Sequence, residues 1–158
     1  ADIAGIDDVP ADCEFILVEE DGYGEAHPFS GEKLCVVLTV YKYGRFQEAT
    51  DIVNGIHDYQ GAGHSCGIQT KNDDHALELA LKTHTTRVMV RQPQSMGNSG
   101  DWNNGMPFTG SLGCGTWGGN IVSENITLKH FLNNTWLSTP IRGVIPSDEE
   151  LFGDAMKD

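Results

Sequence analysis

Hydrophobic residues in the first part of this chain fall into short runs and then into a helical pattern. Residues 15–18 and 36–41 are apolar or β-branched runs bounded by turn residues, which is typical of buried strands. From residue 46 the period becomes helical, and one face collects Phe46, Ala49, Ile52, Val53 and Ile56. This pattern predicts an amphipathic helix packed on a sheet. Gly55 inside it costs roughly 1 kcal/mol relative to alanine, so we expect the helix to end near Tyr59.

The alternation of apolar runs and amphipathic stretches continues to residue 91. Residues 66–70 and 87–91 have the character of further short strands. Between them, Asp73 or Asp74 is suited to cap a second helix that reaches His84. Strand, helix and strand at this spacing are typical of βαβ units with right-handed crossovers. The sequence therefore predicts an α/β fold with a mainly parallel sheet and flanking helices.

Beyond Pro93 both periods disappear. Residues 94–120 are rich in glycine and asparagine, and an aperiodic stretch of this length inside a compact domain is usually functional. Residues 110–125 read GSLGCGTWGGNIVSEN, a nearly uncharged segment suited to close backbone contact with a ligand or a neighbouring strand. Residues 127–138 predict one extended strand, and the acidic tail from Ser147 predicts a short helix.

The charge and cysteine content narrow the class of protein. The net charge is −13 at pH 7 with only ten lysines and arginines, which argues against nucleic-acid binding because phosphates need clustered basic residues. No run of eighteen apolar residues occurs, so we expect no membrane span. Cys13, Cys35, Cys66 and Cys114 form no C-x-x-C pair and no zinc spacing with histidine. This predicts a cytoplasmic protein with reduced thiols and no metal site; a secreted protein with two disulfides is the alternative.

Several motifs follow one another in a fixed order. They are EKL at 32–34, GAGHS at 61–65, GCGTWGGN at 113–120, SEN at 123–125 and KH at 129–130. In this order and spacing, across residues 3–138, the chain resembles the CoA-acylating branch of the aldehyde dehydrogenase superfamily. The sequence of residues 102–119 is most similar to the sulfoacetaldehyde or succinate-semialdehyde dehydrogenases of that branch.

The resemblance implies that this chain is the distal part of a catalytic domain. In the family a cysteine thiolate attacks the aldehyde, hydride leaves to NAD or NADP, and coenzyme A removes the acyl group as a thioester. The family nucleophile and cofactor domain precede the matched region, so we expect a missing N-terminal part of the same enzyme and no activity from this chain alone. Residues 1–126 then correspond to the distal catalytic domain, 127–140 to a strand that pairs across a homo-oligomer interface, and 141–158 to an acidic tail.

Two residues carry family roles through their motifs. Glu32 matches the glutamate that binds the nicotinamide ribose hydroxyls, and a solvated surface glutamate is the alternative. His64 matches a histidine near the CoA-transfer step, where a pKa near neutrality suits proton transfer from the incoming thiol. A structural, hydrogen-bonded histidine is the alternative.

The glycine-rich loop supplies the remaining site candidates. Gly113, Cys114 and Gly115 match a wall of the substrate pocket, although tight packing of two elements explains such glycines equally well. Arg91, at the end of a strand, is the candidate for binding an anionic substrate tail, with a surface salt bridge as the alternative. Cys66 and Cys114 are better explained as small buried residues than as nucleophiles.

Two rival functions remain open. The first is a non-catalytic interaction module derived from such an enzyme, and the second is a complete small hydrolase using Cys66 or Cys114 with His64. The expected partners under the main hypothesis are a small aldehyde, coenzyme A, the missing N-terminal part and further copies of the chain.

Overall fold

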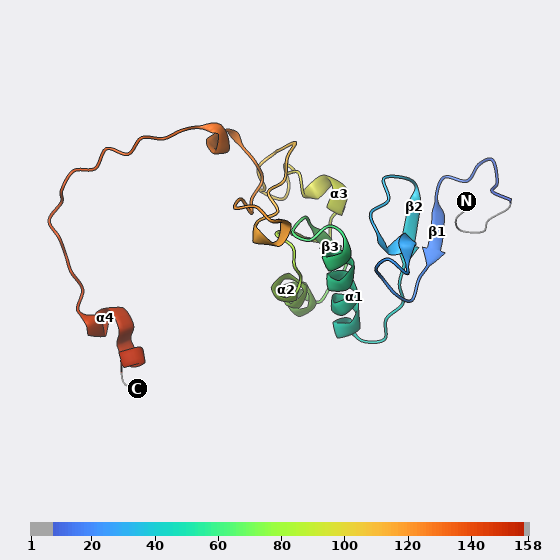
Figure 1. Cartoon of the computed structure of the whole chain (residues 1–158), viewed down its shortest axis with the longest axis horizontal. Coiled ribbons are helices and arrows are strands. Elements are labelled where there is room, and N and C mark those ends of the chain that lie inside the picture. Colours follow the sequence, from blue (N-terminus) through green and yellow to red (C-terminus); the bar gives the residue numbers. More distant parts are fainter. Residues whose placement is uncertain (1–7, 157–158) are drawn as a thin grey trace.

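The computed structural model describes residues 8–156, so residues 1–7 of the predicted first domain and the last two residues of the tail lie outside it. Figure 1 shows a two-stranded pair at one side, a central body of helices and loops, and a long C-terminal arm. No helix within residues 8–156 is long and apolar enough to cross a membrane.

The four strands predicted between residues 15 and 91 form, as two separate parallel pairs. β1 (Ile16–Glu19) pairs with β2 (Val37–Val40), and β3 (Cys66–Ile68) pairs with β4 (Val88–Val90). The α/β class and the parallel pairing are confirmed. The expected single sheet is not present in the described chain, because no strand of residues 8–156 joins β2 to β3.

The two long helices begin where side chains cap them. α1 (Phe46–Tyr59) follows Gly44 and Arg45, whose backbone N–H groups donate to the Glu48 carboxylate at 2.8 and 3.2 Å. These bonds lower the pKa of Glu48. α2 (Asp73–Lys82) is capped by Asn72, whose side chain accepts from the Asp74 N–H at 3.0 Å, so the predicted cap at Asp73 or Asp74 was one or two positions late.

Gly55 lies inside α1 without interrupting it, and the helix ends at Tyr59 as expected. The ring of Tyr23, from the segment after β1, packs on this glycine. A Cβ at position 55 would lie 2.2 Å from the Tyr23 ring. The missing side chain thus makes room for a contact between α1 and the β1–β2 side of the molecule.

The central body contains β3, β4, α2 and the glycine-rich loop. The predicted aperiodic stretch includes two short helices, α3 (Gln94–Gly97) and η3 (Thr116–Gly118), and is closed by a bridge between Leu112 and Asn125. Among the described residues the buried apolar side chains are Cys66, Leu79 and Met89. The body is therefore held together largely by buried polar residues.

The C-terminal part leaves the body as an arm (Figure 1). The predicted strand at 127–138 begins instead as η4 (Leu128–Phe131), because His130 Nδ1 accepts the Thr127 N–H at 2.9 Å and tightens this turn. Residues 132–147 have no regular structure, and their pairing with a second copy stays a prediction. The expected tail helix is confirmed as α4 (Asp148–Phe152), followed by η5 (Gly153–Met156). Within residues 8–156 the remaining short element is η2 (Pro28–Ser30).

Candidate functional site

The turn that carries His64 and the loop that carries Gly113 lie against each other. Gly63 has φ +86°, and a Cβ there would lie 2.3 Å from the Cys114 carbonyl oxygen. A Cβ at Gly113 would lie 2.3 Å from the Val122 carbonyl oxygen. Both positions therefore require glycine for close backbone packing. The structure brings two of the predicted motifs together, and a substrate contact at Gly113–115 stays a prediction.

Arg87, just before β4, holds the His64 turn and the glycine-rich loop together at what we call the junction. This role was not predicted from the sequence. Arg87 is 5% exposed. Its Nε donates to Asn125 Oδ1 at 2.8 Å, and its Nη1 donates to the carbonyl oxygens of Gly113 at 2.8 Å and His64 at 3.3 Å. Burial lowers the pKa of Arg87, and its Nη2 has no hydrogen-bond partner among residues 8–156. One guanidinium thus ties the His64 turn to both ends of the glycine-rich loop.

The His64 ring is exposed, but its Nδ1 is engaged. It lies 2.7 Å from the hydroxyl of buried Ser65. That hydroxyl also accepts from Gln94 Nε2 at 3.0 Å and from Asn98 Nδ2 at 3.2 Å. Gln94 and Asn98, at the two ends of α3, therefore hold the serine that orients the histidine.

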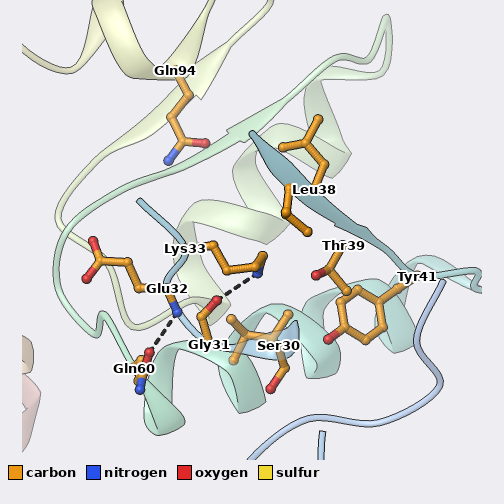
Figure 2. A pocket seen from close by; sticks show the side chains of 11 residues that line it. Ser30, Gly31, Glu32, Lys33, Leu38, Thr39, Tyr41, Gln60 and Gln94 are labelled. Atoms are coloured by element: carbon orange, nitrogen blue, oxygen red, sulfur yellow. Dashed lines mark hydrogen bonds between the residues drawn. The ribbon is translucent and has the colours of Figure 1, made fainter. Parts of the chain in front are cut away.

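Glu32 lies on the rim of a hollow of about 510 Å³ between β2 and the C-terminal end of α1. Its backbone N–H donates to Gln60 Oε1 at 2.7 Å, and Gln60 directly precedes the turn with His64. Figure 2 shows the Glu32 carboxylate directed away from the Lys33 ammonium, which instead donates to the Gly31 carbonyl oxygen at 2.7 Å. Glu32 and the His64 turn are therefore placed at the same end of α1.

Arg91 is placed apart from this junction. It has φ +54°, so it ends β4 in a left-handed conformation that is unusual for a residue with a side chain. Its guanidinium pairs with Asp73 Oδ1 at 2.8 Å and donates to the Thr70 carbonyl oxygen at 3.1 Å. The salt-bridge alternative describes this geometry, and binding of a substrate anion by Arg91 stays a prediction.

Neither cysteine near His64 has the surroundings of a nucleophile. Cys66 is buried, and burial raises the pKa of its thiol. Cys114 is half-buried, with its Sγ 3.8 Å from the Leu112 carbonyl oxygen. A reactive cysteine needs a thiolate in an electropositive, accessible place. This geometry does not favour the small-hydrolase alternative.

Sequence reasoning missed Arg87, which stands directly before β4. Its role depends on three segments that are distant in sequence, so the pattern of residues alone carries no signal for it. The same holds for Gln94 and Asn98, which the sequence places in an aperiodic stretch.

The chain is similar along its length to curated acylating dehydrogenases. It is 49% identical over 158 residues to sulfoacetaldehyde dehydrogenase of Acholeplasma sp, covering 100% of this chain and 32% of that protein. It is 42% identical over 155 residues to sulfoacetaldehyde dehydrogenase (acylating) of Cupriavidus necator, covering 98% and 31%. With succinate-semialdehyde dehydrogenase (acetylating) of Clostridium kluyveri it shares 37% identity over 154 residues, covering 97% and 34%. The chain thus spans about one third of the length of these relatives.

Solved structures agree with this relationship. An acetylating aldehyde dehydrogenase from Geobacillus thermoglucosidasius superposes with a TM-score of 0.80 at 27% identity, covering 92% of this chain and 32% of that one. A probable aldehyde dehydrogenase from Listeria monocytogenes gives 0.79 at 32% identity, covering 95% and 32%. No family model matches the chain. The resemblance predicted from the motifs is confirmed: the chain is homologous to a part of the acylating aldehyde dehydrogenases and has the fold of that part.

Proposed function

We propose that this chain is the distal catalytic part of an NAD(P)-dependent enzyme that converts a short anionic aldehyde to an acyl-CoA thioester. The main support is the similarity to sulfoacetaldehyde dehydrogenases along the whole chain. Arg87 hydrogen-bonds to His64 of the GAGHS motif and to Gly113 of the GCGTWGGN motif, so two motifs that carry the similarity lie side by side in the structure. The remaining catalytic groups, including the nucleophile, belong to the part of the relatives that this chain does not span.

Glu32 fits the binding of the dinucleotide ribose. Its side chain is exposed, and no hydrogen bond or ion pair within the described part of the chain occupies its carboxylate. Two carboxylate oxygens can accept two neighbouring hydroxyl groups. The dinucleotide, when bound, accepts the hydride from the aldehyde carbon; Glu32 would orient its ribose.

The contacts of His64 favour a hydrogen-bond donor over a general base. Because the Ser65 oxygen already accepts from two side-chain amides, its own hydrogen is left to donate to His64 Nδ1. A neutral imidazole that accepts at Nδ1 carries its proton on Nε2. His64 therefore presents an N–H group to the exposed side, and Ser65 is its positioning residue.

This N–H suits the thioester-forming step. Coenzyme A, having lost its thiol proton to solvent, adds its sulfur to the carbonyl carbon of the acyl-cysteine. The carbonyl oxygen takes the negative charge and returns it as the cysteine thiolate leaves. His64 Nε2–H would donate to that oxygen and keep its proton, as donors of an oxyanion hole do.

A pair of amide substitutions in the full-length enzyme tests the function and this role together. Sulfoacetaldehyde oxidation is followed by NAD(P)H absorbance with and without coenzyme A. We expect His64→Gln, which places an N–H near the Nε2 position, to stay within about tenfold of the parent kcat. His64→Asn, which mimics Nδ1, is expected to lose about 100-fold or more, as when an oxyanion donor is removed.

The controls separate the two claims. His75→Gln, on α2, should leave both rates unchanged. Equal losses of kcat in the His64→Gln and His64→Asn variants would indicate that His64 acts as a general base instead. Absence of CoA-dependent turnover in the parent enzyme would overturn the proposed function and favour the interaction module. CoA-dependent turnover by the 158-residue chain alone would overturn the proposal that the chain is only a part of the enzyme.

A further inference from the structure

Trp117, in η3 of the glycine-rich loop, packs its ring on the ring of His84. The ring centroids lie 4.7 Å apart and the ring planes differ by 17°, so the two rings are stacked. His84 belongs to the segment between α2 and β4. The stack is therefore a side-chain contact between the glycine-rich loop and a segment about 30 residues earlier in the chain.

The backbone of His84 is fixed on both sides. Its N–H donates to Asn54 Oδ1 of α1 at 3.1 Å, and its carbonyl oxygen accepts the Gly63 N–H at 2.7 Å. These bonds hold His84 against the C-terminal part of α1 and against the turn that carries His64. The imidazole ring thus extends from an anchored backbone toward the glycine-rich loop.

The ring of His84 also contacts a carboxylate. Its Nδ1 lies 3.0 Å from Oδ1 of Asp58, one residue before the end of α1. Because an ionised carboxylate only accepts hydrogen bonds, Nδ1 carries a hydrogen in this contact. We call Asp58, His84 and Trp117 together the clasp, since they link α1 to the glycine-rich loop through one imidazole ring.

A second proton on the His84 ring strengthens both contacts of the clasp. The hydrogen bond to Asp58 becomes a charge-assisted ion pair. The stack on Trp117 becomes a cation–π contact, which is more favourable than the stack of two neutral rings. Histidine is the side chain that ordinarily gains this proton between pH 8 and pH 5.

Other charged or titratable groups lie on the elements that pack against His84. Burial lowers the pKa of His57, whose charge is also opposed by His84 and His64, so His57 stays neutral while His84 takes up its proton. Lys82, two residues before His84, is held at 2.7 Å by Glu78. The complete set is Asp58 and His57 of α1, His64 of the turn, Cys114 of the loop, and Lys82 and Arg87 beside His84. The direct contact is with the negative charge of Asp58, and it favours the proton.

We propose that the clasp is a pH-sensitive device, which holds the glycine-rich loop to α1 when His84 is protonated and loosens the loop when His84 is neutral. The backbone bonds of the loop follow this change. The Gly118 N–H donates to the Cys114 carbonyl oxygen at 3.2 Å, and the Asn120 N–H donates to the Gly115 carbonyl oxygen at 2.9 Å. The inference concerns the mobility of this loop and goes beyond the proposed function, on which it does not depend.

Fluorine NMR of the chain labelled with 5-fluorotryptophan tests the proposal. The chain has three tryptophans, and Trp117→Phe assigns the resonance of the clasp. Between pH 8 and pH 5.5 we expect the Trp117 resonance to move in one titration step. The resonances of Trp102 and Trp136 should stay in place, since those side chains are 93% and 91% exposed and neither contacts a histidine ring in the described chain.

Three variants identify the proton. His84→Gln should abolish the titration step of Trp117, and Asp58→Asn should move the step to lower pH because the carboxylate no longer favours the proton. His57→Gln is the matched control, one turn along the same end of the molecule, and should keep the step. A Trp117 resonance that does not titrate, or that titrates equally in His84→Gln, overturns the proposal.

Hydrogen exchange then shows whether the proton holds the loop. After correction for the intrinsic pH dependence of exchange, the protection of the Gly118 and Asn120 amides should rise about threefold from pH 8 to pH 6, as an exposed cation–π contact allows. The rise should vanish in His84→Gln. Protection that does not change with pH, although the Trp117 resonance titrates, also overturns the proposal.

The full-length enzyme gives the same two measurements if the chain alone does not fold, and their absence there overturns the proposal. Neither measurement uses turnover. A failure of the proposed function is therefore distinguishable from a failure of the clasp.

Discussion

The two parallel strand pairs are similar in length and in sequence character, yet one is buried and the other is bare. In the β3–β4 pair Met89 is 2% exposed, whereas in the β1–β2 pair Leu38 is 58% exposed. Parallel sheets are normally covered on both faces. α2 contacts β4, and the glycine-rich loop is hydrogen-bonded through Gly113 to Arg87 just before that strand. On the other side, the ring of Tyr23 after β1 packs on Gly55 of α1. The difference shows that, within residues 8–156, the β3–β4 pair has neighbours that cover it and the β1–β2 pair has fewer of them.

The most direct way to break this comparison is to truncate one leucine on each side. Leu79 of α2 is 4% exposed, and Leu79→Ala should lower the free energy of unfolding by about 3 kcal/mol because it leaves a cavity. Leu38→Ala in the chain alone should cost less than about 0.5 kcal/mol, as an exposed substitution does. Urea unfolding of the chain measures both. Equal losses would mean that the β1–β2 pair is already covered.

A second substitution sharpens the account of the buried side. Arg87→Met should cost about 2 kcal/mol, because it removes the buried donor shared by Asn125 Oδ1 and the carbonyl oxygens of Gly113 and His64. Arg91→Met is the matched control and should cost less than about 0.5 kcal/mol, since its ion pair with Asp73 is exposed. The same unfolding assay applies. A loss at Arg91 as large as that at Arg87 would contradict the role of Arg87 at the junction.

The smallest expected effect is a pH dependence from His57. Burial lowers the pKa of His57 below its ordinary value of 6.5. Below about pH 6.5 the unfolded chain therefore binds a proton at His57 that the folded chain does not bind. The stability that neutral His57 contributes to the folded chain is complete above about pH 6.5 and is lost as the pH falls below that value. Unfolding free energies of the parent and His57→Gln, compared at pH 8 and pH 5.5, measure this loss. An identical pH slope in both proteins would show that His57 is solvated.

The sequence predicted which helices and strands form better than it predicted which of them lie side by side. The periods of α1 and α2 and the four apolar runs fix local structure, and all of these elements formed. The separation of the sheet could not be predicted, since a strand pattern does not identify the strand beside it. The extended strand expected from residue 127 failed at its start because one side chain, His130, bonds the backbone of Thr127.

The candidate site was predictable only where a motif carried it. Glu32, His64 and Gly113–115 came from the resemblance, and the structure places His64 and Gly113 at one junction. Arg87 and Ser65 were missed because their importance arises from hydrogen bonds between distant segments. Arg91 was selected for its charge, and the structure shows that charge paired with Asp73.

The contact of Tyr23 with Gly55 has a consequence for protein engineering. Replacement of a helical glycine by alanine is a common stabilising change, worth roughly 1 kcal/mol in helix propensity. Here a methyl group at position 55 would occupy the place of the Tyr23 ring. An isolated peptide of α1 would gain helicity from that change, whereas the protein would lose the packing of the Tyr23 ring, from the segment after β1, on α1. Thermostability libraries built on helix propensity should therefore leave this glycine unchanged.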